Sequence, residues 1–164
     1  MVLDQIFRMV RPIAWRSASS WSCTRCGKCC KLLVPIKIGE ALYYQKEYGT
    51  STIEYFNKGL HLKKRSDGYC IFLDWVNGRA HCSIYHFRPR ACALYPFYIY
   101  KKPLYGNDEM AVFQLFSERY YVYIDANCPG INRGYVPINS IIVNAILFWI
   151  GKSDFIELES MQVL

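Results

Sequence analysis

The chain has 164 residues, 52% of them hydrophobic and 20% charged, so it can bury a core of its own and is not intrinsically disordered. Its net charge of +7 is uneven, because residues 1–65 hold 12 Lys and Arg against 4 Asp and Glu, whereas residues 66–164 hold 8 against 9. The longest apolar run, Ile141 to Ile150, is about half as long as a bilayer span. We therefore expect one globular domain, 1–164, without a transmembrane helix.

Residues 1–22 form a predicted N-terminal helical arm. Its apolar residues fall on one helical face at positions i, i+3, i+4 and i+7: Leu3, Ile6, Phe7 and Val10. Pro12 should end this helix near Arg11. The arm is amphipathic rather than continuously apolar, so it does not have the pattern of a secretory signal. A reducing compartment, the cytoplasm, is therefore the expected location.

Half of the eight cysteines lie in one octet, Cys23-Thr24-Arg25-Cys26-Gly27-Lys28-Cys29-Cys30. A C-x2-C pair lets two thiolates converge on one ion, and Gly27 permits the tight turn between them. Cys29 and Cys30 extend the pattern, and as neighbours their side chains should point apart. The other cysteines follow singly: Cys70, Cys82, Cys92 and Cys128. All eight are candidate ligands of zinc or of an iron–sulfur cluster. A disulfide framework is the alternative for an even count, but it requires an oxidising compartment.

The basic residues around the octet have two interpretations. Four thiolates around Zn²⁺ or a [4Fe-4S]²⁺ core leave a net charge of −2, which Arg25, Lys28 and Lys31 could offset. Alternatively, the basic N-terminal half is a surface for RNA or another polyanion. The triplet Lys63-Lys64-Arg65 is interpreted as a solvated surface run more readily than as a nucleic-acid contact.

After the octet, Leu32 to Ile36 forms a short extended run, and residues 39–48 have helical composition up to Gly49. Ser51 and Glu54 have the spacing of a capping box, which predicts a further helix from Thr52 to Lys58.

Asn77-Gly78 predicts a hairpin between strands Tyr69 to Trp75 and Arg79 to Tyr85. With a two-residue turn, paired residue numbers sum to 155, so Cys82 faces Leu73 while Cys70 belongs to the opposite face. Either a bulge shifts one strand, or the two thiols serve different sites, or Cys70 lies outside the ladder.

The rest of the chain alternates short helices and strands. Pro89 should open a short helix that ends at Tyr95-Pro96, and the runs 111–116 and 120–124 predict a second hairpin. In the C-terminal helical segment, 131–164, a buried helix over 137–150 has Asn139 or Ser140 as N-cap, and a last short helix follows Ser153. The predicted fold class is α+β: short helices and two β-hairpins organised around a cysteine-ligated metal site.

The ordered cysteine motifs resemble those of a known family, the YkgJ-type cysteine-cluster proteins described as zinc- or iron-chelating domains. The matching segments span a core of 23–130: the octet, Gly68 to Leu73, Cys82 to Tyr85, Arg88 to Cys92 with Tyr95-Pro96, and Cys128-Pro129-Gly130. This combination is far more specific than one C-x2-C pair. The resemblance implies metal binding, with zinc and iron–sulfur both in use in the family's description.

The cysteine cluster is also distantly similar to that of the flagellin lysine N-methylases. This suggests, by analogy, a cluster-dependent protein-modifying enzyme related to lysine methylation. The chain itself carries no local catalytic pattern: its histidines are few, and it lacks a Walker or dinucleotide signature. The leading hypothesis is a metal-binding protein, slightly favouring a [4Fe-4S] cluster over zinc. It would serve as a structural or redox accessory subunit of a larger protein or ribonucleoprotein assembly, and a basic, RNA-associated zinc protein is the other alternative.

Overall fold

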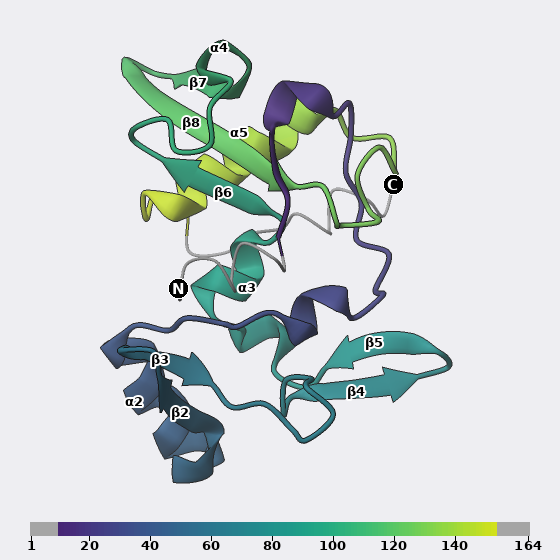
Figure 1. Ribbon diagram of the computed structural model, residues 1–164, viewed down its shortest axis with the longest axis vertical. Helices are drawn as coiled ribbons and strands as arrows, with labels where there is room; N and C mark the ends of the chain where they lie inside the picture. Colours follow the sequence, from purple (N-terminus) through teal and green to yellow (C-terminus); the bar gives the residue numbers. More distant parts are fainter. Residues whose placement is uncertain (1–9, 154–164) are drawn as a thin grey trace. The chain divides into compact units, whose positions relative to one another are not determined.

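The computed structural model describes residues 10–153, which divide into two compact units. We call residues 25–93 the cysteine unit, and residues 10–24 with 94–153 the sheet unit. Two predicted helices lie outside the described residues: the N-terminal helix from Leu3, except for its last residues Val10 and Arg11, and the last helix after Ser153. The single-domain organisation stays a prediction, and the predicted α+β class is confirmed, because both units combine helices with antiparallel strands (Figure 1).

The cysteine unit contains two separate hairpins, β2–β3 and β4–β5, and one longer helix, α2. Its elements in chain order are η2 (Lys28–Lys31), α2 (Ile38–Tyr48), η3 (Thr50–Thr52), β2 (Ile53–Phe56), β3 (Gly59–Leu62), β4 (Leu73–Val76), β5 (Arg79–Cys82), η4 (Tyr85–Phe87) and α3 (Arg90–Leu94). α2 confirms the helix predicted before Gly49, which ends it with a φ of 97°. Its first turn is capped by Glu40, whose carboxylate accepts the Lys37 amide at 3.0 Å.

The helix predicted over Thr52 to Lys58 is wrong, because this segment forms the β2–β3 hairpin. Asn57 and Lys58 both have positive φ, 49° and 62°, as a two-residue hairpin turn requires. Ile53 then pairs with Leu62 and packs on the core, so strand pairing and core packing outweigh the local capping pattern.

The β4–β5 hairpin has the predicted register, with Leu73 opposite Cys82 and Asn77-Gly78 at the turn. Its strands are shorter than predicted, and Cys70 lies outside the ladder, where it forms an isolated bridge with Lys64. Among the three arrangements considered from the sequence, the structure has the one in which Cys70 lies outside the ladder.

The sheet unit is built on one four-stranded antiparallel sheet. β8 (Glu118–Asp125) pairs with β1 (Pro12–Ala14), β6 (Phe97–Tyr100) and β7 (Val112–Leu115). The β7–β8 hairpin was predicted, whereas β1 and β6 were not, because each is short and pairs with a strand far along the chain. The unit also contains two short elements, η1 (Trp15–Ser17) and α4 (Asp108–Ala111).

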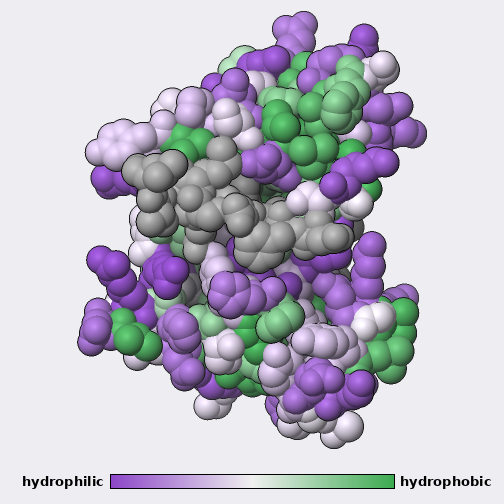
Figure 2. All heavy atoms as spheres, turned by 180° about the vertical axis from the view of Figure 1, so that it is seen from behind, coloured by the Kyte–Doolittle hydropathy of each residue, from purple (hydrophilic) through white to green (hydrophobic). Residues whose placement is uncertain are grey.

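Helix α5 (Ile138–Trp149) confirms the predicted buried helix and lies against β6 (Figure 1). Its buried side chains include Ile141, Ile142 and Ile146, each fully enclosed. The N-cap is Pro137, without a side-chain cap, rather than Asn139 or Ser140. Among the described residues, no helix has both the length and the apolar character to cross a membrane. On the molecular face in Figure 2, hydrophobic residues occur in separate patches among hydrophilic ones.

Candidate metal centre

The octet is shaped by two residues in the left-handed backbone region, Arg25 and Gly27, with φ of 53° and 73°. Gly27 precedes the 3-10 turn η2, which carries Cys29 and Cys30 and is closed by the Cys30 amide donating to the Gly27 carbonyl at 3.0 Å. A Cβ on Gly27 would lie 2.9 Å from Cη2 of Trp75. Glycine is therefore needed here for two reasons, the turn predicted from sequence and a close approach to the β4–β5 hairpin.

Five of the predicted ligands gather in the cysteine unit from four separate segments. Cys30, Cys70, Cys82 and Cys92 pack in one hydrophobic core with Leu62, Phe72 and Ile84. The neighbouring Cys30 side chain raises the pKa of the Cys29 thiol, which places Cys29 close to this group of thiols. That the side chains of Cys29 and Cys30 point apart stays a prediction.

Hydrogen bonds between segments hold this arrangement. The Cys30 carbonyl accepts the Cys70 amide at 2.9 Å and the Lys64 ammonium at 2.7 Å. Glu40 in α2 accepts the Arg90 amide at 2.9 Å, which fixes the start of α3 and hence the position of Cys92 two residues later. Hydrogen bonds thus fix the segments of Cys30, Cys70 and Cys92, in addition to side-chain packing.

The environment of four of these thiols, Cys29, Cys70, Cys82 and Cys92, favours their protonated form in the absence of metal. The pKa of Cys29 is raised, first by the hydrogen bond with Cys30 and then by burial. Burial is the largest cause of the raised pKa values of Cys70, Cys82 and Cys92, and neighbouring thiols add to it. A metal ion bound here must therefore displace protons from sulfur.

Two cations partly compensate the thiols, Lys64 and Arg88. The Arg88 charge acts to lower the pKa of Cys29, Cys82 and Cys92, and its guanidinium lies 4.0 Å from the Tyr85 ring centroid. Burial lowers the pKa of Lys64, while nearby thiolates oppose that shift. Neither residue was singled out from sequence as a partner of the thiols, because their proximity depends on segments that meet only in the fold.

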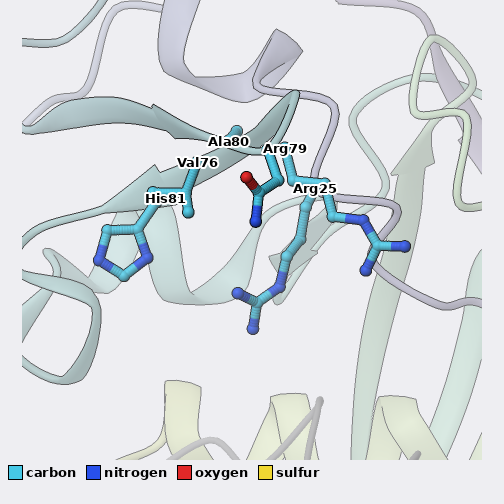
Figure 3. Close-up of a pocket in the computed structure, with 6 residues that line it drawn as sticks. Arg25, Val76, Arg79, Ala80 and His81 are labelled. Carbon is cyan, nitrogen blue, oxygen red and sulfur yellow. The ribbon is translucent and has the colours of Figure 1, made fainter.

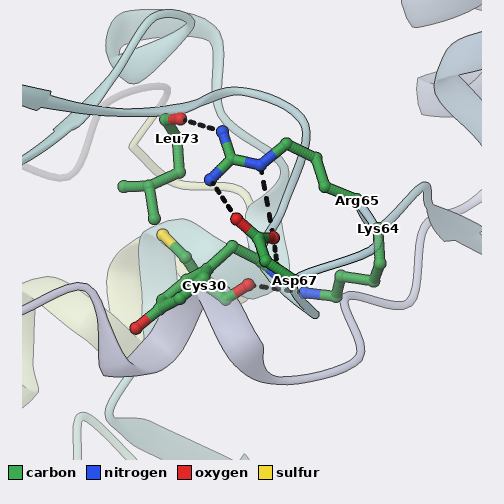
Figure 4. Close-up of polar contacts among 6 residues, drawn as sticks. Cys30, Lys64, Arg65, Asp67 and Leu73 are labelled. Atoms are coloured by element: carbon green, nitrogen blue, oxygen red, sulfur yellow. Dashed lines mark hydrogen bonds and ion pairs between the residues drawn. The ribbon is translucent and has the colours of Figure 1, made fainter.

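The basic triplet 63–65 is consequently not one solvated run (Figure 4). Lys63 is exposed, but Lys64 is directed at the Cys30 carbonyl. The Arg65 guanidinium donates to the Leu73 carbonyl at 2.6 Å and pairs with Asp67 at 3.1 Å. Two of the three cations are therefore used inside the cysteine unit, which corrects the interpretation as a surface run.

The remaining predicted ligands lie elsewhere. Cys26 is exposed in the loop of the octet. Cys23 and Cys128 belong to the sheet unit, where the Trp21 indole donates to the sulfur of Cys128 at 3.3 Å. Gly130 packs against Ser22, the residue directly before the octet. A Cβ on Gly130 would be 2.1 Å from the Ser22 carbonyl oxygen. Close backbone packing thus explains why glycine follows Cys128-Pro129.

Within residues 10–153, no group of three or more His, Cys, Asp or Glu side chains has the arrangement of a formed metal site. All eight cysteines are free thiols. The fit to a metal therefore rests on donor chemistry: several soft sulfur donors, gathered in one core and flanked by two cations, suit zinc or an iron–sulfur cluster. The residues present fit such a group.

Fold and thiols together define a small α+β cysteine-cluster protein. The family described as "CxxCxxCC: Putative zinc- or iron-chelating domain" matches residues 22–129, about two thirds of the chain, and the chain belongs to this family. The resemblance stated from the motifs is confirmed. No curated protein and no solved structure gave a significant match.

Proposed function

We propose that this protein binds a cysteine-ligated metal centre, a [4Fe-4S] cluster in preference to zinc, with its core in the cysteine unit. The observation that carries this proposal is the gathering of five thiols from four segments, which we call the inner ligand candidates: Cys29, Cys30, Cys70, Cys82 and Cys92. One zinc or one [4Fe-4S] cluster takes four thiolates, so five thiols are enough for one site with one left over.

The other three cysteines, Cys23, Cys26 and Cys128, are proposed as ligands of the same centre or of a second one. The family pattern includes the octet, and its match ends with Pro129, directly after Cys128. If these thiols bind a metal in the folded chain, the energy of metal binding becomes folding energy.

The proposed role is structural or redox, as an accessory subunit of a larger protein or ribonucleoprotein assembly in a reducing, cytoplasmic compartment. Exposed apolar side chains on two neighbouring elements support a protein partner: Ile38 and Leu42 on α2 are 67% and 60% exposed, and Tyr55 on β2 is 73% exposed. The alternative link to protein lysine methylation stays a hypothesis.

The test is metal analysis with a visible absorption spectrum on protein purified without oxygen. We expect brown protein with broad absorption near about 400 nm and about four irons per chain. Colourless protein with stoichiometric zinc would keep the metal-binding function and overturn the cluster type. Protein that is folded and free of both metals, and stays so after anaerobic reconstitution with iron and sulfide or with zinc, would overturn the proposal.

A further inference from the structure

The cysteine unit has a hollow of about 450 Å³ at the β4–β5 hairpin, on which neither the metal proposal nor the family match depends. Its lining comes from the octet loop and the hairpin: Arg25, Val76, Asn77, Arg79, Ala80 and His81. This volume is within the range of small-ligand sites, roughly 300–1,000 Å³. The hollow is therefore large enough for a nucleotide-sized molecule.

The polar groups around the hollow favour an anion. They are two guanidinium groups, an imidazole and a carboxamide, and none of these lining residues carries a carboxylate. Arg79 and His81 occupy alternate positions of β5 and so share one face of the hairpin. Figure 3 shows the side chain of Arg25 between that of His81 on one side and that of Arg79 on the other.

The two arginines are held near each other by the backbone. The Ala80 amide donates to the Arg25 carbonyl at 2.9 Å, which joins the octet loop to β5 beside Arg79. The contact of Gly27 with Trp75 fixes the same loop against β4. Little ordering of the backbone is then required when a ligand binds, which favours affinity.

The net positive charge of the whole cysteine unit also favours the binding of an anion. Residues 25–93 hold 12 Lys and Arg against 5 Asp and Glu, a net charge of +7, so this unit accounts for the entire net charge of the chain. A field of this sign concentrates anions at the surface of the unit.

We propose that this hollow binds a phosphoryl group of a nucleotide-sized ligand. A carboxylate has two oxygens and satisfies one guanidinium fork, whereas a phosphoryl group offers three oxygens and can accept from both Arg25 and Arg79. The side chain of Val76, opposite Arg79 in the ladder, provides an apolar wall for the rest of the ligand. The phosphoryl group belongs either to a free mononucleotide or to the backbone of single-stranded nucleic acid.

The experiment measures binding of AMP by calorimetry and of a short, labelled single-stranded oligonucleotide by fluorescence anisotropy, with full-length, metal-containing protein. Arg79→Gln should weaken both interactions about tenfold, because it removes one charge-assisted pair. The Arg25→Gln/Arg79→Gln variant should weaken them about a hundredfold. An oligonucleotide that binds at least about tenfold more tightly than AMP assigns the ligand to nucleic acid, and equal affinities assign it to free nucleotides.

The matched control is Lys46→Gln/Lys63→Gln, which removes the same charge from two exposed positions of the same unit. It should change each affinity by less than about twofold. Equal losses in the control and the double-arginine variant would show that only overall charge matters and would overturn the site. The site would also be overturned if wild-type protein bound neither AMP nor the oligonucleotide. Metal content is measured in each variant, so loss of the metal centre is distinguished from loss of the phosphoryl site.

Discussion

Replacing Cys92 with serine separates a metal ligand from an ordinary core residue. In metal-free protein, the change places a hydroxyl where a buried sulfur packs against the thiol core. An unsatisfied buried hydroxyl costs about 1–3 kcal/mol, which corresponds to a lowering of the melting temperature by roughly 2–12 °C for a chain of this size.

In metal-loaded protein the expected loss is larger. Structural zinc sites contribute on the order of 10–16 kcal/mol of apparent binding energy, and removal of one thiolate forfeits a substantial part of it. The variant should therefore lose several kcal/mol more in the loaded form than in the chelated form. Metal content should fall in the same preparations.

The assay is thermal and denaturant unfolding of wild type and variant, each with metal and after chelation under anaerobic conditions. Ala93→Ser is the matched control, because it buries a hydroxyl at the next position of α3 without removing a thiol. We expect the control to be equally destabilised in both forms. Equal destabilisation of Cys92→Ser in both forms, with full metal loading, would refute the assignment of Cys92 as a ligand.

Four further outcomes are expected. Cys26→Ser should reduce metal content, although this thiol is exposed, and unchanged loading and melting would exclude it from the ligands. Lys64→Gln should destabilise the protein by about 1–3 kcal/mol and weaken metal retention because the Cys30 carbonyl loses its charged donor and keeps only the Cys70 amide, whereas Lys63→Gln should be silent in both unfolding and metal assays. Gly130→Ala should destabilise the protein, since a Cβ meets the Ser22 backbone, while Gly39→Ala in α2 should stabilise it by about 0.5–1 kcal/mol; the reverse order in urea unfolding would contradict the close packing. Burial raises the pKa of Tyr98 and Tyr100, so the folded state holds their protons more tightly than the unfolded state, and stability should fall as pH rises above about 10; a flat alkaline stability profile with early tyrosinate absorbance would contradict this.

The sequence by itself determined the local elements whose signals are short-range. Asn77-Gly78 specified the turn and register of β4–β5, Gly49 the end of α2, and the apolar run after Pro137 the buried helix α5. It also determined the family, because the order and spacing of the cysteine motifs are properties of the chain alone. These features depend on neighbouring residues or on composition, so no knowledge of distant contacts was needed.

Tertiary structure decided whatever depends on contacts between distant segments. The capping pattern of Ser51 and Glu54 was overruled by pairing of β2 with β3, since burial of Ile53 against Leu62 outweighs one local cap. The role of Lys64 as donor to the Cys30 carbonyl joins residues 34 positions apart, and no sequence period marks it. The gathering of the thiols and the arginine-lined hollow at the β4–β5 hairpin likewise follow from how separate segments pack. The sequence specifies the chemistry of each side chain. Which side chains lie next to each other is decided by long-range packing, which the whole core stabilises.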